Sequence, residues 1–432
     1  MQVSVEATSG LERRMTVEVP AERIEQEVKT RLKSLAGKAK LDGFRQGKVP
    51  FNIVERKFAG RVRSEVMGDM ISSTFQEALS QEKLRPAGGP KIETLYEQPE
   101  KGLGYTATFE VYPEIALAPL DKVTIDKPVV AITEQDIDNM LVNLRKQRPN
   151  WKPAERGAQL GDQLQIEFKT HVVGAESGQG PSQQTTVVLG TGALPKEVEE
   201  KLLGLSAGEE TSIGRPASVD EQGPEGSKLI DKYTIKVIAL YQADLPELDE
   251  AFAKSLGVES GTMEDLRTEV RGNMQRELDL AIKNKLKQQV MDVLLERNPV
   301  EIPKAPLDKE IDALIEQTKT KYKGQAPQSR ADYEPAARRR VALGLIIGDI
   351  IRTNSIKADA DKVRDLVDSL ASTYEDSDEV VKWYYSSRER LDQVESLVLE
   401  DQVVDWVLEH TQVSEKTSSF DALINPPQTV VT

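Results

Sequence analysis

The octapeptide Gly43-Phe44-Arg45-Gln46-Gly47-Lys48-Val49-Pro50 indicates how the rest of this chain is organised. Its two glycines and its proline predict a loop whose backbone can take few shapes. Between them lie an aromatic residue, Phe44, and two cations, Arg45 and Lys48. A loop that only joined two helices would not need a phenylalanine at its tip. A loop that docks on a large anionic surface would use arginine and lysine for phosphate, and phenylalanine for an apolar or stacking contact.

The residues on either side of this loop are strongly basic. Residues 22–63 hold twelve cations and five anions, a net charge of +7, in a chain whose net charge is −15. A positive tip on an acidic body orients the molecule in an electric field. The alternative interpretation is a solvated, lysine-rich helical hairpin without a binding role.

The octapeptide also contains all six fixed positions of the pattern Gly-Phe-Arg-x-Gly-Lys-x-Pro. In this it resembles the ribosome-docking motif of the trigger factor family, a family of bacterial ribosome-associated chaperones. The resemblance extends along the whole chain, in its length and its order of domains. It implies contact with the large ribosomal subunit near the tunnel exit, through ribosomal protein and rRNA, by Gly43, Phe44, Arg45, Gly47, Lys48 and Pro50.

Length and composition limit the possible classes of protein. A chain of 432 residues predicts two to four domains, and an aromatic content of 5% indicates an elongated molecule with modest cores. Cysteine is absent and only His171 and His410 occur, so we expect no disulfide, no metal site and no cofactor.

The chain begins without a basic region followed by an apolar one, and no apolar run approaches the roughly 20 residues that span a bilayer. We therefore expect a cytoplasmic protein without membrane contact. The acidic net charge confines any expected RNA contact to the basic loop.

Residues 1–112 are predicted to form an α+β domain. Met15, Val17 and Val19 alternate as in a half-buried strand, and Tyr105, Ala107 and Phe109 repeat the pattern. Two helices are expected between these strands, at about 21–40 and from Pro50 onward, so that the octapeptide connects them. Residues 113–150 contain four prolines and are predicted to be an extended linker with one short helix, capped by Thr133 and Asp136.

Residues 151–245 are glycine-rich and predict a small β-rich domain with one helix at about 196–203. The segment resembles the FKBP-type prolyl isomerase domain found in the middle of trigger factors, through Gly161-Asp162 and the hexapeptide at 205–210. The resemblance implies an isomerase pocket, for which the candidate residues are Phe168, Leu194, Val198 and Tyr233.

This pocket departs from the family pattern at two places. Pro195-Lys196-Glu197-Val198 replaces the usual Ile-Pro-Gly-Phe, and residues 218–225 lack the usual tyrosine. Isomerisation is faster when an apolar pocket desolvates the X-Pro amide. Charged residues in such a pocket would be poor substitutes, so we expect isomerase activity that is weak or absent.

Residues 246–432 are predicted to be helical, with a disordered tail at about 425–432. The longest helix, at 262–297, has apolar residues every fourth position, and that stripe winds around a helix of 3.6 residues per turn. We interpret it as an arm that packs at its base and offers apolar residues further out; the alternative is a buried bundle helix. Trp383, Tyr384 and Tyr385 are expected to anchor a core, and residues 338–340, all arginine, to contact acidic residues of the same molecule.

Two functional interpretations remain. The first is an ATP-independent, ribosome-associated chaperone that keeps nascent chains open and assists folding and export. The second is a free FKBP-type prolyl isomerase whose helices recruit substrate. The sequence leaves the set of clients, and a homodimer in the free state, open.

Overall fold

A computed structural model describes residues 1–38, 41, 44, 49–98, 100–171, 182–215, 231–321, 329–372, 374 and 376–425. The chain separates into two compact units, residues 1–127 with 283–416 and residues 128–282 with 417–432. Both contain helices and sheets, which confirms the predicted multidomain α+β class. The domain boundaries expected after residues 112, 150 and 245 stay a prediction.

The N-terminal sheet has four antiparallel strands in the order β1-β2-β4-β3. They are β1 (Gln2–Ser9), β2 (Glu12–Val19), β3 (Lys91–Gln98) and β4 (Gly102–Glu110). The two strands predicted from alternation are confirmed as β2 and β4. They pair so that Met15 lies opposite Ala107 and Val17 opposite Tyr105, and all four side chains are buried.

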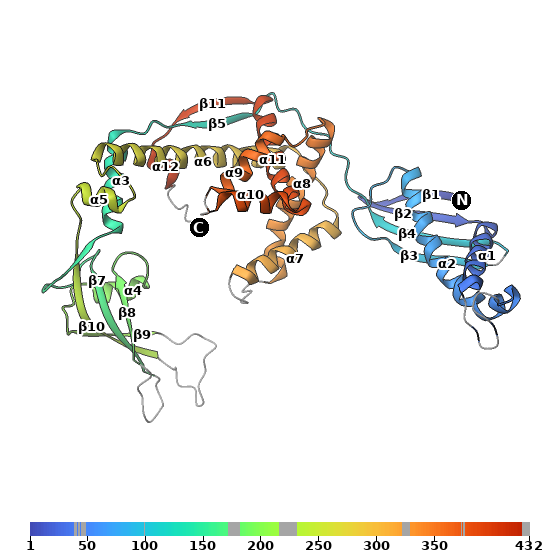
Figure 1. Ribbon diagram of the computed structural model, residues 1–432, viewed down its shortest axis with the longest axis horizontal. Helices are drawn as coiled ribbons and strands as arrows, with labels where there is room; N and C mark the ends of the chain where they lie inside the picture. Colours follow the sequence, from blue (N-terminus) through green and yellow to red (C-terminus); the bar gives the residue numbers. More distant parts are fainter. Residues whose placement is uncertain are drawn as a thin grey trace. The chain divides into compact units, whose positions relative to one another are not determined.

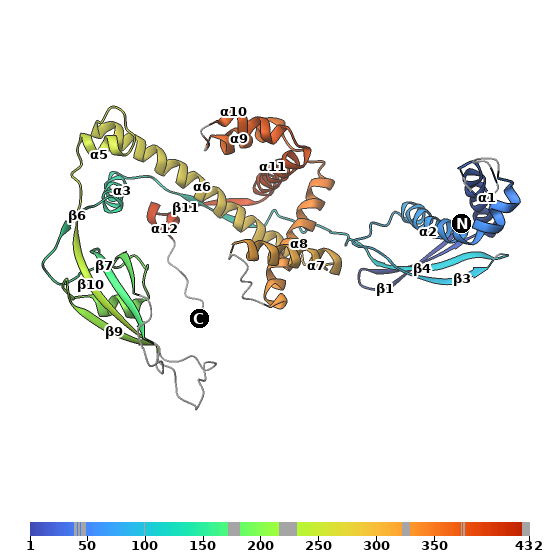
Figure 2. The ribbon, with the colours of Figure 1, turned by 60° about the horizontal axis from the view of Figure 1, so that its bottom comes forward.

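Helices α1 (Ala21–Lys38) and α2 (Phe51–Gln81) lie side by side in this domain (Figures 1 and 2). Their apolar faces pack with the buried residues of β2 and β4 in one core. Pro50 is the N-cap of α2, so the second predicted helix begins where expected.

The segment expected to be an extended linker is built into two cores. It forms β5 (Thr124–Val129), which pairs with β11 (Gln412–Thr417), and α3 (Glu134–Gln147). Leu120, Val123 and Ile125 are buried against side chains of α6, α8 and α11. The Thr133 and Asp136 cap of α3 is confirmed.

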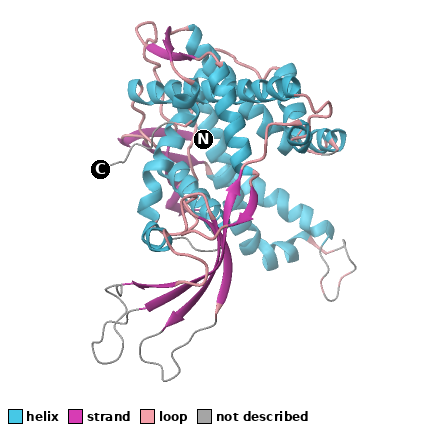
Figure 3. Ribbon diagram, turned by 90° about the vertical axis from the view of Figure 1, so that its left-hand side faces the viewer, coloured by secondary structure: helices cyan, strands magenta, loops and turns pink. Residues whose placement is uncertain are grey.

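Residues 150–244 contain a five-stranded antiparallel sheet, the strands at the bottom of Figure 3. Its members are β6 (Asn150–Pro153), β7 (Gln163–His171), β8 (Gln183–Val188), β9 (Glu210–Arg215) and β10 (Asp231–Asp244). β10 pairs with β6, β7 and β9, and β8 pairs with the other edge of β7. The predicted helix is α4 (Lys196–Leu202).

The remaining described elements are helical. They are α5 (Glu250–Ser255), α6 (Met263–Arg297), α7 (Lys304–Lys321), α8 (Arg330–Thr353), α9 (Ala360–Ala371), α10 (Ser377–Tyr385), α11 (Arg388–Glu409) and α12 (Phe420–Ile424). Residues 426–432, most of the tail predicted to be disordered, lie outside the described residues.

The interpretation of α6 as an arm with a free apolar face is wrong. Its first half buries Leu266, Val270, Met274 and Leu278 in a core with α3, α5 and α12. Its second half buries Val290, Met291 and Leu294 in the core that contains β5, α8 and α11. Because the stripe winds, each half packs on different partners. Leu280, which lies between the two halves and outside the stripe, has a side chain that is 59% exposed.

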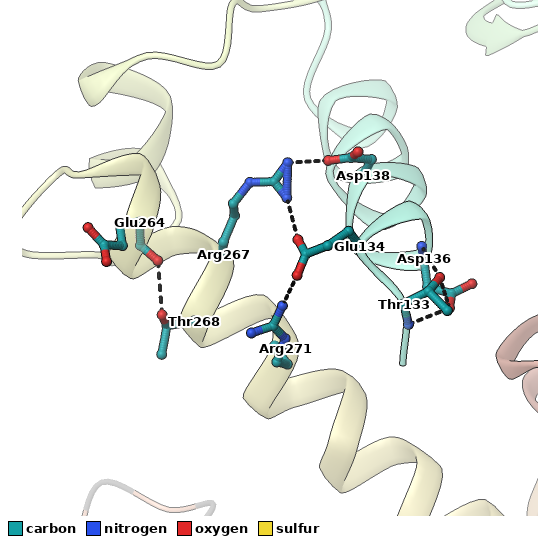
Figure 4. Close-up of polar contacts among 8 residues, drawn as sticks. All are labelled: Thr133, Glu134, Asp136, Asp138, Glu264, Arg267, Thr268 and Arg271. Carbon is teal, nitrogen blue, oxygen red and sulfur yellow. Dashed lines mark hydrogen bonds and ion pairs between the residues drawn. The ribbon is translucent and has the colours of Figure 1, made fainter. Parts of the chain in front are cut away.

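Ion pairs join side chains of α3 and α6 (Figure 4). Arg267 contacts Glu134 and Asp138, which lie one turn apart on α3, and Arg271 contacts Glu134 as well. All of these groups are at least a third exposed, so each pair stabilises the contact by only about 0–1 kcal/mol. We infer that they set the register of the two helices more than their stability.

The arginine run before the middle of α8 behaves as predicted. Arg338 pairs with Glu334, Arg339 with Asp292 and Arg340 with Glu310. These cations are therefore occupied within the molecule.

Candidate docking loop, apolar cavity and family

The structure describes part of the predicted docking loop. Gly43, Arg45, Gly47 and Lys48 lie outside the described residues. The side chain of Phe44 is 39% exposed, and its backbone N–H donates to the carbonyl of Leu41 at 3.0 Å. Val49 is buried, and the carbonyl of Pro50 accepts from Ile53 N–H at 3.0 Å at the start of α2. The start of α2 is thus fixed by a backbone hydrogen bond, and the side chain of Phe44, which precedes it in the chain, is open to solvent.

Charge on the hairpin is distributed less simply than the sequence count indicates. Four arginines form ion pairs: Arg23 with Glu77, Arg31 with Asp69, Arg61 with Glu65 and Arg63 with Glu25. Three of these acids lie outside residues 22–63, so the count of +7 overstates the local field. Within the part of the chain that is described, no ion pair engages the remaining hairpin cations Lys29, Lys33, Lys38, Arg56 and Lys57.

The second candidate site is an apolar cavity of about 240 Å³ in the β-rich domain. Three of the four predicted residues, Phe168, Leu194 and Val198, line it together. Tyr233 lies in β10 opposite Thr170 of β7 and Ile213 of β9, and its side chain is outside the described part.

Sequence reasoning missed the other lining residues, which are Ile166, Thr185, Ile213 and Ile235. The sequence alone could have indicated two of these residues. Ile166 lies two residues before Phe168 in β7, and Ile235 two residues after Tyr233 in β10, so strand alternation puts each on the same face as its neighbour. Thr185 and Ile213 come from β8 and β9, whose pairing no local pattern shows.

The argument that charged residues spoil this cavity is not supported. Lys196 and Glu197 begin α4, but both are exposed and neither lines the cavity. The only polar residue among its described lining is Thr185. The other departure from the pattern, at 218–225, lies outside the described residues.

In the same domain, Asp162 fixes the start of β7. Its side chain is 5% exposed and accepts from both terminal nitrogens of Arg156, at 2.5 and 2.9 Å, and from the N–H of Gln159 at 2.8 Å. The hydrogen bonds with Asp162 raise the pKa of Arg156. Because Asp162 immediately precedes β7, this contact fixes the point at which that strand begins.

Helices α9 to α11 expose large apolar side chains. Trp383 is 53% exposed and Tyr385 48%, so the prediction that these two anchor a core is wrong. Tyr384 alone of the three is half-buried in the core of α9 and α11. The ring of Trp383 is instead covered on one side by the guanidinium of Arg390, 3.9 Å from the ring centre. Tyr374 and Leu397, at 62% and 48%, are exposed in the same region.

No helix in the described ranges is both long enough and apolar enough to cross a bilayer.

Comparison with known proteins gives full-length matches. Residues 1–144 match the model of the bacterial trigger factor protein, and residues 262–409 match the model of its C-terminus. The trigger factor of Thioalkalivibrio sulfidiphilus is 43% identical over 99% of this chain and 98% of its own length. That of Alkalilimnicola ehrlichii is 41% identical over 99% and 96%.

One solved structure comes from a study of promiscuous substrate recognition in the folding and assembly activities of the trigger factor chaperone. It covers 95% of this chain and 99% of its own at 18% identity, with a TM-score of 0.48. The sequence relatives, matched from end to end, are decisive: this chain belongs to the trigger factor family.

Proposed function

We propose that this protein is an ATP-independent chaperone that docks on the large ribosomal subunit near the tunnel exit and shelters nascent chains. The observation that carries the proposal is the solvent-exposed Phe44 within a complete docking motif, in a chain 43% identical to a trigger factor over its whole length. Exposed apolar side chains such as Trp383, Tyr385 and Leu280 suit weak contacts with clients of many sequences.

Co-sedimentation with purified ribosomes at low salt tests the docking. The change Phe44→Ala/Arg45→Ala/Lys48→Ala should abolish pelleting, because it removes the aromatic contact and two phosphate-binding cations together. A matched control is Lys83→Ala/Arg85→Ala, which removes two exposed cations just beyond the C-terminal end of α2 and should pellet as the wild type does. Unchanged pelleting of the loop variant would reject docking and favour the free isomerase.

We also propose that the β-rich domain binds Xaa-Pro segments in its apolar cavity and isomerises them. The cavity supports this, because an apolar wall desolvates the amide and favours the twisted state in which resonance is lost. The expectation that turnover is weak stays a prediction, and it now rests on residues 218–225 alone.

Turnover of a proline tetrapeptide measures this second activity. Phe168→Ala should lower kcat/KM by about tenfold, because loss of a lining aromatic admits water. Leu160→Ala, a change at a 67% exposed side chain of the same domain, should leave kcat/KM unchanged. A wild-type rate equal to the uncatalysed rate would refute the activity.

A further inference from the structure

Helices α7 and α8 pack against each other through a small core of their own (Figures 1 and 2). Its buried side chains are Leu307, Ile311 and Leu314 from α7, and Tyr333 and Ala337 from α8. The second half of α8 belongs to a different core, in which Ile346 and Ile350 pack with side chains of α6 and α11. The hairpin made by α7 and the first half of α8 therefore depends on few apolar contacts.

Tyr333 is the larger of the two side chains that α8 contributes to this small core, and it is 7% exposed. Among the described residues, none forms a hydrogen bond with its buried hydroxyl. A hydroxyl gives up its hydrogen bonds to water when it is buried, and in the packed form of the hairpin nothing replaces them. When the hairpin opens, water reaches the hydroxyl again. The hydroxyl of Tyr333 therefore favours the open form.

Two further features make the packed form of the hairpin weak. Pro335 lies inside α8 and has no N–H, so the carbonyl of Ala331 lacks the donor that residue 335 would otherwise supply. Arg330 joins the two helices through Asp308 and Asp312, but all three side chains are largely exposed. Water and salt screen such pairs, so they stabilise the hairpin little.

The packed form covers an apolar face of α7. Leu307, Ile311 and Leu314 recur every three or four residues, so they lie on one side of the helix. All three are buried beside Tyr333 and Ala337 of α8. Once α8 moves away, these aliphatic side chains form a contiguous surface that suits an apolar segment of an unfolded chain.

We propose that the packing of α8 on α7 is an autoinhibitory contact, which covers the apolar face of α7 and opens readily because the hydroxyl of Tyr333 is unpaired. The hydroxyl thus sets the fraction of molecules in which that face is available to a client. The inference rests on the proposed chaperone function for its client, whereas opening of the hairpin requires neither a client nor a ribosome.

Deuterium exchange of the full-length protein without clients tests the opening. Tyr333→Phe removes the unpaired hydroxyl and keeps the ring, so amides of residues 304–321 should exchange about fivefold more slowly than in the wild type. Exchange of these amides that is equal or faster in the variant would overturn the inference.

The same substitution at Tyr105 is the matched control, because the hydroxyl of that buried tyrosine has a partner in Oγ1 of Thr74, at 2.9 Å. Tyr105→Phe should leave the exchange of residues 304–321 unchanged and should speed exchange in β4. A slowing of exchange at 304–321 in both variants would overturn the inference, since it would not depend on the unpaired hydroxyl.

A photoreactive benzophenone side chain at Thr318, a half-buried residue one turn beyond Leu314, reports client contact with α7. The probe is a reduced and alkylated, permanently unfolded polypeptide. Its cross-linking should fall about fivefold when Tyr333→Phe is added, because fewer molecules are open. Unchanged cross-linking would overturn the inference, since clients would then reach α7 without opening of the hairpin.

Failure of the chaperone proposal gives a different result. The wild type would then neither cross-link to the probe nor suppress aggregation of an unfolded client, although Tyr333→Phe would still slow exchange at residues 304–321. In that case the contact has no client to exclude, and the inference fails together with the chaperone function.

Discussion

Tyr105 shows at the scale of one residue how the N-terminal domain is held together. It is fully buried in β4, and its hydroxyl lies 2.9 Å from Oγ1 of Thr74 and 3.3 Å from the carbonyl oxygen of Ile71, both on α2. A buried hydroxyl with these partners ties the sheet to the helix whose other end begins beside the docking loop.

Tyr105→Phe should lower the local free energy of opening by about 1 kcal/mol, the usual contribution of a buried hydrogen bond. Amides of β4 and of the middle of α2 should then exchange with deuterium about fivefold faster. The control Tyr374→Phe removes a hydroxyl from a 62% exposed side chain and should change no exchange rate. Equal protection of β4 in the Tyr105 variant and the wild type would contradict this account.

The same residue gives a dependence on pH. Burial raises the pKa of Tyr105 above the value of about 10 that it has in the unfolded chain. Its contribution to stability is therefore complete below pH 10 and is lost as the pH rises through the raised value of the folded state. Between pH 9 and pH 11 the urea midpoint for protection of β4 should fall less in Tyr105→Phe than in the wild type. An identical fall would show that another group is responsible.

Single residues of the cavity were predictable where the segment resembles a known family. Phe168, Leu194 and Val198 were predicted as cavity residues from that resemblance, and the structure brings the three together. Trp383 and Tyr385 were placed wrongly, because large aromatics are usually buried and sequence does not show what covers a helix. They lie on α10, a helix of nine residues without a fully buried side chain.

At the scale of elements, two amide side chains, one on α6 and one directly after its last residue, hold the segment that follows the N-terminal sheet. Gln289 accepts from the N–H of Asp126 at 3.0 Å and donates to its carbonyl at 2.7 Å. Asn298, which is buried, accepts from the N–H of Ala118 at 2.8 Å and donates to the carbonyl of Leu294 at 2.8 Å. These contacts explain why a proline-rich segment is ordered.

Asn298→Ala should release this segment, because it leaves the N–H of Ala118 without its acceptor, at a cost of about 1–3 kcal/mol. Deuterium exchange of peptides covering residues 115–125 should rise at least about fivefold. Gln275→Ala is a suitable control, since this amide on α6 donates to the exposed side chain of Asp279. Unaltered exchange at 115–125 would mean that apolar burial of Leu120 and Val123 suffices.

Local patterns predicted elements well and their partners poorly. The winding stripe of α6 correctly excluded a single partner along the helix, but it did not indicate that both halves would be buried. The pair β5 and β11 was missed, because its strands are separated by some 280 residues of sequence and are mostly polar on their exposed side. Such pairing depends on tertiary packing, which alternation within one segment does not report.

At the scale of the whole molecule, the two proposed tasks would use different kinds of surface. The cations without an ion-pair partner discussed above gather on the α1–α2 hairpin, while exposed Trp383, Tyr385 and Leu280 lie in the helical part. Salt screens the interactions of the charged surface, but it does not screen those of the apolar surface. Ribosome docking and client protection should therefore respond to ionic strength in different ways.

Raising the salt concentration from about 50 to 500 mM should weaken ribosome binding steeply. If three cations of the hairpin replace counterions on rRNA, the logarithm of the binding constant should fall with the logarithm of salt with a slope of about −2. Suppression of aggregation of an unfolded client should stay level over the same range, because burial of apolar surface does not require opposite charges. The variant Phe44→Ala/Arg45→Ala/Lys48→Ala should protect the client as well as the wild type does. A parallel loss of both activities in salt, or in this variant, would mean that one charged surface serves both and that the two tasks are not separated along the chain.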